Sequence, residues 1–286
     1  MKIIRIVLRC KLVLMKKILF FLILMQRLSC LASSVDTVII YSNSMKKDIK
    51  CVVITPDSYK TKQTDYPVVY LLHGYSGDFS NFVKKIPGIK QQADNLQLIL
   101  VCPDGANSWY FDSPVDPSKR YETYISKEVP DYIDTHYRTI KNKYGRAITG
   151  LSMGGHGSLF LGLRHPQFYG ACGSMSGGVD LISMYEKFDI NKVLGDSITG
   201  AKYWKDYSVS NLVENYKRSD SLSIIIDCGT GDFMFPVNHQ LHNKMLQLKI
   251  PHDYIERPGE HTWDYWSNAV QYQLLFFRNY FNRYYK

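Results

Sequence analysis

From Val68 onward, apolar segments alternate with segments that have the periodicity of amphipathic helices. This alternation favours a mostly parallel central sheet with helices on both faces. We therefore expect an α/β fold with one domain over residues 35–286. The expected strands are 38–41, 51–54, 67–74, 98–102, 146–149, 170–175, 222–227 and 252–257, and the expected helices are 88–94, 121–136, 152–165, 238–248 and 263–280.

One segment, residues 176–220, interrupts the alternation. It separates two strong strand signals and is too long for a plain connection. We expect a cap-like insertion whose helices lie at the carboxyl edge of the sheet, near the active site.

The net charge of +9 is concentrated at the N terminus. Residues 1–32 hold seven basic residues and no acidic one, which leaves 28 basic against 26 acidic residues in the rest of the chain. This near-balance gives no strong positive field, so we expect no nucleic-acid partner. A composition of 45% hydrophobic and 21% charged residues is typical of a soluble globular protein.

Residues 1–34 have the pattern of a signal peptide. A basic start at residues 16–17 precedes an apolar run over 18–25 and then small residues, with cleavage after Ala32 or Ser34. Met15 is a second candidate initiator, which would make residues 1–14 an upstream extension. The sequence thus predicts an exported protein, periplasmic or secreted, without a stable membrane span after cleavage.

Two alternatives concern the same segment. Cys30 allows a lipoprotein, although Arg27 stands where such signals favour an apolar residue. An uncleaved anchor is the other alternative, and the short apolar run argues against it.

The cysteines that remain after cleavage lie in apolar, strand-like runs: Cys51, Cys102, Cys172 and Cys228. Buried free thiols are the favoured interpretation, and a disulfide is the alternative, because export implies an oxidising compartment. None has metal-ligand spacing, and we expect no metal or organic cofactor.

The stretch from Gly150 to Gly154 fits the G-x-S-x-G pattern and lies between an expected strand and an expected helix. A nucleophile at such a turn has a strained backbone, so its neighbours must lack a Cβ. The following helix directs its free N–H groups and positive dipole end toward a developing oxyanion. Ser152 is therefore the predicted nucleophile, and a flexible loop is the alternative.

A serine nucleophile needs a base, and the base needs an acid that orients it. In this architecture the acid and then the base follow the serine in the chain, at the carboxyl ends of strands. The stretch "IIIDCGTGDF" supplies Asp232 and "YIERPGEHTWDYW" supplies His261. Asp227 is the alternative acid, although it lies within its strand.

Two backbone N–H groups are predicted to bind the oxyanion, those of Met153 and Tyr75, with Gly74 allowing close approach of the backbone. His156 is expected to pack on the helix after Ser152, and His73 to make a structural hydrogen bond.

The stretch "CPDGANSWYFDSP" leaves a strand end and is rich in turn-forming and aromatic residues. Asn107, Trp109 and Tyr110 are therefore predicted to line the substrate pocket together with Gly74. Packing within a surface loop is the alternative.

Six collinear motifs carry a family resemblance: "LLHGYSGDFSNF", "PDGANSWYFDS", "YETYISKEVPDYIDTHYRT", "ITGLSMGGHGSLFLGLRHPQFYGACGSMSGG", "CGTGDF" and "GEHTWDYW". Over about 38–280 the chain resembles the esterase D branch of the α/β-hydrolases, which includes feruloyl and acetyl-xylan esterases. The resemblance implies an α/β-hydrolase fold, Ser152, Asp232 and His261 as a catalytic triad, and oxyanion N–H groups at Tyr75 and Met153.

These observations predict an exported serine carboxylesterase that hydrolyses short acyl or feruloyl esters through an acyl-enzyme. Its expected partner is a small ester or an acylated oligosaccharide. The alternatives are a thioesterase like S-formylglutathione hydrolase, which is cytosolic in that family, an acyltransferase of the same fold, and a non-catalytic binding module. Transfer to added glycerol would identify an acyltransferase, and failure to react with a fluorophosphonate would favour the binding module. The sequence does not predict an oligomeric state.

Overall fold

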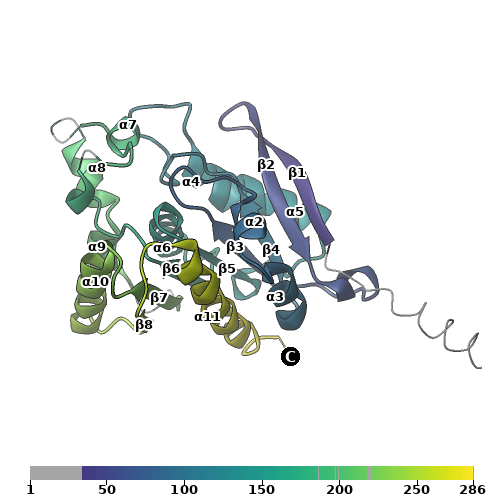
Figure 1. Ribbon diagram of the computed structural model, residues 1–286. Coiled ribbons are helices and arrows are strands. Elements are labelled where there is room, and N and C mark those ends of the chain that lie inside the picture. The colour runs from purple at the N-terminus through teal and green to yellow at the C-terminus, as the bar shows by residue number, and fades with distance from the viewer. Residues whose placement is uncertain are drawn as a thin grey trace, which may run out of the picture. The chain divides into compact units, whose positions relative to one another are not determined.

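One eight-stranded sheet forms the centre of the computed structural model, which describes residues 34–285 except 186, 197, 199, 218 and 220 (Figure 1). The strand order is β1-β2-β4-β3-β5-β6-β7-β8. β2 pairs antiparallel with β1 and β4, and the other neighbouring strands run parallel. The strands are β1 (Ser34–Ser42), β2 (Lys47–Thr55), β3 (Val68–Leu72), β4 (Ile99–Pro103), β5 (Arg146–Gly150), β6 (Ala171–Met175), β7 (Ser223–Gly229) and β8 (Asp253–Arg257).

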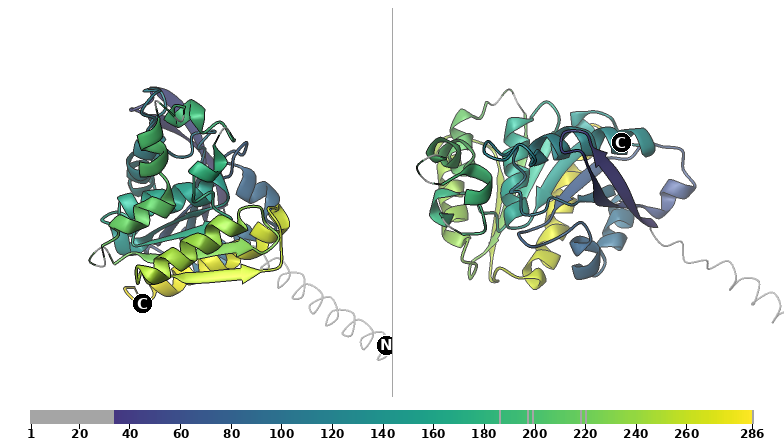
Figure 2. Two further views of the ribbon diagram at one scale, coloured as in Figure 1. Left: turned by 90° about the vertical axis from the view of Figure 1, so that its left-hand side faces the viewer. Right: turned by 90° about the horizontal axis from the view of Figure 1, so that it is seen from above.

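Helices cover both faces of this sheet, as the alternation in the sequence predicts (Figures 1 and 2). The helices of one face are α2 (Asn81–Lys85), α3 (Ile89–Leu96) and α11 (Trp263–Phe281), and those of the other are α5 (Val129–His136), α6 (Met153–Arg164) and α10 (Phe235–Gln247). In β3, Val69 and Leu71 pack toward the first face, whereas Tyr70 packs toward the second. Burial on both faces explains why β3 is a continuous apolar run.

The helix predicted over 121–136 is interrupted in the structure. A short helix α4 (Tyr121–Thr123) leads into a π-helical turn over Tyr124–Glu128, and α5 follows. Pro130 lies at the start of α5 and has no N–H to donate to the preceding turn. A widened turn at this point accommodates that missing hydrogen bond, which the periodicity of the apolar residues does not reveal.

In its described residues, the segment over 176–220 forms short helices: η4 (Ile182–Met184), α7 (Asn191–Leu194), α8 (Ala201–Asp206), α9 (Val209–Leu212) and η5 (Val213–Asn215). It packs against the loop that follows β4. Trp109 Nε1 donates to the Phe188 carbonyl at 3.0 Å, and Ser113 Oγ donates to the Val193 carbonyl at 2.6 Å. The segment therefore lies at the carboxyl edge of the sheet.

The four cysteines after residue 34 are free and buried, which confirms the favoured interpretation: Cys51, Cys102, Cys172 and Cys228. Burial raises the pKa of the Cys172 thiol above its ordinary value. Within the described residues, no helix has both the length and the apolar character needed to cross a membrane. The predicted signal peptide lies outside the described residues, apart from Ser34.

Candidate active site

Ser152 occupies the turn between β5 and α6, with a backbone conformation that is unusual for a serine. Its φ of 56° and ψ of −117° lie outside the regions that residues with a Cβ normally adopt. A Cβ added to Gly154 would collide with the backbone carbonyl of Leu72 in β3. The glycine beside the turn therefore lets the chain pass close to the sheet, as the motif predicts.

His261 connects Ser152 to a buried carboxylate. Its Nε2 lies 2.9 Å from Ser152 Oγ, and its Nδ1 lies 2.9 Å from each carboxylate oxygen of Asp232. Asp232 is 3% exposed and follows β7, whereas His261 follows β8. A ring that donates from Nδ1 to the carboxylate leaves Nε2 able to accept the serine proton. Three side chains predicted from separate strand ends thus form one hydrogen-bonded chain.

Asp227, the alternative acid, lies inside β7 and has other partners. One of its carboxylate oxygens accepts from Arg257 Nη2 at 2.6 Å, and the other accepts from the Tyr265 hydroxyl. Burial raises the pKa of the Asp227 carboxyl, and these two donors oppose that rise. Asp227 therefore links β7 to β8 and α11, and the structure places Asp232 beside His261.

The two N–H groups predicted to bind the oxyanion are those of Tyr75 and Met153. Among the described residues, neither N–H donates to another backbone group. Met153 begins the twelve-residue helix α6, so the positive end of the helix dipole faces the Ser152 turn. Both groups are thus available to a ligand.

The loop after β3 is held in place by His73 and Asn107. The Gly105 N–H donates to His73 Nε2 at 2.8 Å, so the ring carries its proton on Nδ1, which donates to the Gly74 carbonyl at 2.8 Å. The Ser76 N–H donates to Asn107 Oδ1 at 2.8 Å. The structural hydrogen bond expected of His73 is confirmed.

A cavity of about 260 Å³ opens beside Ser152. It is lined by Gly74, Tyr75, Ser76, Gly77, Asn81, Lys85, Leu151, Ser152, Trp263 and Trp266. Trp266 contacts the His261 ring with centroids 4.8 Å apart, and its Nε1 donates to Ser176 Oγ at 3.1 Å. The cavity therefore offers space for an ester next to the Ser152 hydroxyl.

Of the four residues predicted to contact substrate, Gly74 lines this cavity, whereas Asn107, Trp109 and Tyr110 do not. Trp109 is 1% exposed and is bonded to the Phe188 carbonyl. Tyr110 is fully buried, and its hydroxyl donates to the His73 carbonyl at 2.9 Å. Trp109 and Tyr110 therefore support the surrounding loops from within and do not line the cavity beside Ser152.

Phe233, the last residue of the "CGTGDF" motif, contacts His261, and Phe188 in turn contacts Phe233. Phe233 is 59% exposed, and its ring centroid is 4.4 Å from that of His261 and 6.4 Å from that of Phe188. Phe233 directly follows Asp232, so its place just after a strand end is the signal that could have found it. Its exposed ring offers an apolar surface beside the histidine.

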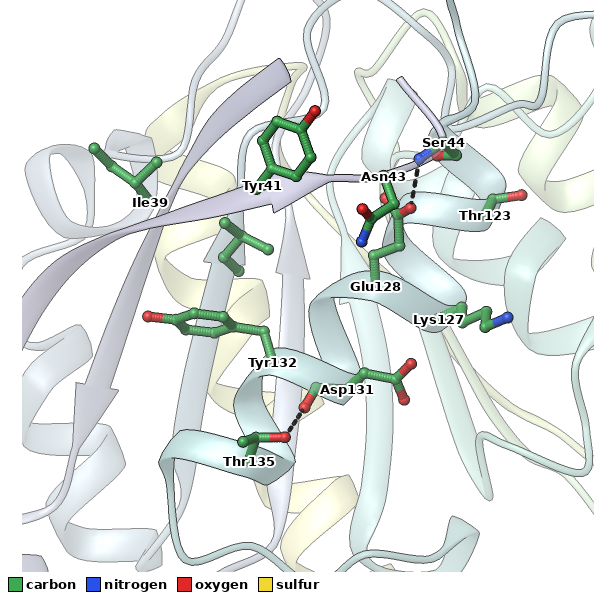
Figure 3. Close-up of a pocket in the computed structure, with 11 residues that line it drawn as sticks. Ile39, Tyr41, Asn43, Ser44, Thr123, Lys127, Glu128, Asp131, Tyr132 and Thr135 are labelled. Atoms are coloured by element: carbon green, nitrogen blue, oxygen red, sulfur yellow. Dashed lines mark hydrogen bonds between the residues drawn. The ribbon is translucent and has the colours of Figure 1, made fainter. Parts of the chain in front are cut away.

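A larger cavity, of about 790 Å³, lies between β1 and the helical residues from Thr123 to Thr135, which include α5 (Figure 3). Its lining includes Tyr41, Lys127 and Tyr132, and the Ser44 N–H donates to the Glu128 carboxylate at 2.8 Å. No residue of the Ser152 hydrogen-bonded chain lines it. Cavity size therefore does not locate the candidate active site.

His156 packs on α6 as expected and is fully buried. Its Nε2 lies 3.0 Å from the Tyr207 carbonyl, and its ring contacts those of Phe111 and Phe160. Burial lowers its pKa to about 3, so the ring is neutral near pH 7. In the described part of the chain, no three His, Cys, Asp or Glu side chains are grouped so that they could hold a metal ion.

A comparison with protein families finds one model, described as "Putative esterase", that matches residues 42–277. An esterase of Mycobacterium tuberculosis is 27% identical over 235 residues, which are 73% of this chain and 52% of that protein. An acetyl esterase of Caldicellulosiruptor saccharolyticus is 25% identical over 252 residues, which are 80% of this chain and 92% of that protein. The chain thus spans about half the length of the mycobacterial relative.

Two solved structures are similar over 87% of this chain and 99% of theirs. One is a ferulic acid esterase with a TM-score of 0.76 and 27% identity. The other is a Staphylococcus aureus fluorophosphonate-binding serine hydrolase with a TM-score of 0.77 and 20% identity. At 20% identity, the similarity to the Staphylococcus aureus hydrolase concerns the fold alone. This similarity and the strand order of the sheet together identify the α/β-hydrolase fold.

Proposed function

The chain belongs to the esterase family, and from that premise we propose that it is an exported serine carboxylesterase acting on short acyl or feruloyl esters. The observation that carries the proposal is the hydrogen-bonded chain from Ser152 through His261 to Asp232. A serine, a histidine and a buried carboxylate in this order are the machinery of acyl transfer.

The chemical steps follow from the positions of these groups. Ser152 Oγ attacks the ester carbonyl while His261 Nε2 accepts its proton, and Asp232 stabilises the imidazolium. The N–H groups of Tyr75 and Met153 stabilise the oxyanion. His261 then gives its proton to the departing alcohol. In the second half of the reaction, His261 Nε2 accepts a proton from the water that attacks the acyl-enzyme, and it returns that proton to Ser152 Oγ as the carboxylic acid leaves.

The acyl group is proposed from the surroundings of His261. Phe233 places an apolar ring beside His261, and Phe188 extends this apolar surface by stacking on Phe233, which suits a planar acyl group such as feruloyl. The names of two relatives, an acetyl esterase and a ferulic acid esterase, support acyl groups of this range. A relative from Bos taurus, 28% identical over 213 residues that are 67% of this chain and 72% of that protein, is an S-formylglutathione hydrolase, which makes that thioester a second candidate substrate.

Export is proposed from the N-terminal sequence pattern. Mass spectrometry of the protein secreted by an expressing bacterium would identify the mature N terminus. An intact N terminus on a protein recovered from the cytoplasm would contradict export.

The experiment that tests the activity combines a covalent probe with a substrate panel. A fluorophosphonate should label Ser152 in the wild type and leave Ser152→Ala unlabelled. The exposed Ser183→Ala is a matched control that should still react. The panel of methyl ferulate, acetylated xylan, tributyrin and S-formylglutathione then ranks the substrates by kcat/KM. Absence of labelling together with absence of turnover on all four would overturn the proposed function.

A further inference from the structure

Three lysines that are far apart in the sequence meet at one cavity of about 240 Å³. Lys47 begins β2, Lys119 follows β4, and Lys192 lies in α7. Each lines the cavity, although 72 and 73 positions of sequence separate one lysine from the next. The fold therefore creates a concentration of positive charge that the order of residues does not show.

The carboxylates near these lysines do not balance them. Lys192 Nζ lies 2.9 Å from Asp189, and Lys119 Nζ lies 3.1 Å from Asp116. Lys47 pairs with no carboxylate in the described part of the chain. Three ammonium groups thus meet the two carboxylates of Asp116 and Asp189, so an anion in the cavity would meet a small net positive charge, centred on Lys47.

The same cavity offers neutral hydrogen-bond donors. Lys47 Nζ donates to the Tyr121 hydroxyl at 3.1 Å and leaves that hydroxyl proton available to another acceptor. Asn107 also lines the cavity, and because its Oδ1 accepts from Ser76, its NH₂ group remains a donor. Ammonium, hydroxyl and amide donors around one space are the groups that bind a carboxylate or a similar oxyanion.

Two hydrogen bonds connect this cavity to the candidate active site. Asn107 accepts from the Ser76 N–H, and Asp189 accepts from the Tyr75 hydroxyl at 2.7 Å. Tyr75 and Ser76 line the cavity beside Ser152, so the loop that carries them contacts residues of both cavities. A group bound among the lysines would contact residues that hold the loop with the Tyr75 N–H.

We propose that the cavity between Lys47, Lys119 and Lys192 binds an anionic group, a carboxylate or a comparably small oxyanion. The group is carried either by the ester substrate, an assignment that rests on the proposed function, or by a free anion. In the first case the cavity determines specificity for acidic esters, such as esters of carboxylated sugars. In the second it holds an anion that contacts the oxyanion loop through Asn107 and Asp189.

The first experiment compares esters that differ in charge and little else. In the first pair, 4-acetoxybenzoate carries a carboxylate on the alcohol side of the ester and 4-acetoxybenzamide is its neutral counterpart. In the second pair, mono-4-nitrophenyl succinate carries a carboxylate on the acyl side, and the 4-nitrophenyl ester of succinamic acid is its neutral counterpart. In the variant with Lys47→Gln, Lys119→Gln and Lys192→Gln, the ratio of kcat/KM for the charged over the neutral ester should fall by about tenfold in at least one pair. The neutral esters should react within about twofold of the wild-type rate.

A matched control removes the same total charge elsewhere. Lys62→Gln, Lys90→Gln and Lys141→Gln change exposed lysines that line neither cavity, so the ratios should keep their wild-type values. The wild-type ratio should also fall as salt rises, because a Debye length of about 8 Å at 0.15 M screens exposed charges.

The second experiment does not depend on catalysis. Calorimetric titration with inorganic phosphate at low ionic strength should show binding to the wild type and to the control variant, and loss of binding in the variant of the three cavity lysines. A change in the ester ratios identifies the substrate as the source of the anion, and a change in phosphate binding alone identifies a free anion. Unchanged ratios together with unchanged phosphate binding would overturn the proposal, whereas absent ester turnover would contradict only the proposed function.

Discussion

The cavity beside Ser152 is about a third as large as the one between β1 and α5, with about 260 Å³ against 790 Å³. The smaller cavity lies at the carboxyl ends of parallel strands, where three loops bring a hydroxyl, an imidazole and a buried carboxylate within hydrogen-bond distance. The larger cavity lies at the sheet's edge strand, and none of Ser152, Asp232 and His261 lines it (Figure 3). The comparison shows that reactive side chains within hydrogen-bond distance of one another identify the candidate active site, whereas cavity volume does not.

The largest effect expected in this comparison is that of Ser152→Ala. Removal of the nucleophile should lower kcat for 4-nitrophenyl acetate by a factor on the order of 10⁵, because only the oxyanion groups and substrate binding remain. Steady-state kinetics measures the loss, and circular dichroism verifies that the variant is folded. Activity within tenfold of the wild type would show that the smaller cavity is not the site.

The next largest effect distinguishes Asp232, in the loop after β7, from Asp227, within β7. Asp232→Asn should lower kcat by about 10³ to 10⁴, because the amide no longer stabilises the imidazolium or fixes the His261 tautomer. Asp227→Asn should leave kcat within about tenfold of the wild-type value. It should instead lower the free energy of unfolding by about 1–3 kcal/mol, because Arg257 and Tyr265 lose their charged partner. Kinetics and urea denaturation measure both variants, and a larger kcat loss in Asp227→Asn would reverse the assignment of the acid.

A smaller effect is expected from Phe233→Ala. Loss of the exposed ring beside His261 should lower kcat/KM for methyl ferulate by about tenfold and change that for 4-nitrophenyl acetate by less than about threefold. Leu246→Ala, which removes a residue of similar exposure from α10, is the control. Equal losses on both esters would mean that Phe233 positions His261 and does not contact the acyl group.

The smallest effect is expected at the larger cavity. Lys127→Gln combined with Asp131→Asn changes two exposed residues of its lining, and kcat/KM on every ester should stay within about twofold of the wild type. The same assays that measure Ser152→Ala provide this comparison. A loss of tenfold or more would require a role for the larger cavity in substrate turnover.

The sequence predicts those parts of the molecule whose determinants are local. Alternation of apolar segments predicts the strands, and the ends of those strands mark the loops of Ser152, Asp232 and His261. Their convergence follows because parallel strands end at one edge of the sheet. The choice of Asp232 over Asp227 also depends on a local fact, the position of each residue relative to the end of β7.

Contacts between distant segments could not be predicted in the same way. Trp109 and Tyr110 have the residue types of a binding loop, yet left-handed backbone angles and long-range hydrogen bonds place them in the interior. The lysine-lined cavity depends on β2, the loop after β4 and α7, and the segment that supplies α7 has no readable motif. Tertiary packing therefore decides these positions, and the sequence pattern does not.

The backbone at Ser152 has a consequence for engineering this fold. A non-glycine residue with a φ of 56° and a ψ of −117° costs the folded state about 1–3 kcal/mol, which the surrounding sheet and helix must offset. Glycine tolerates such angles more readily, so Ser152→Gly removes the nucleophile and relieves the strain in one change. Selection for thermal resistance alone would therefore favour an inactive protein at this position, and a screen for more durable variants has to measure turnover together with melting temperature.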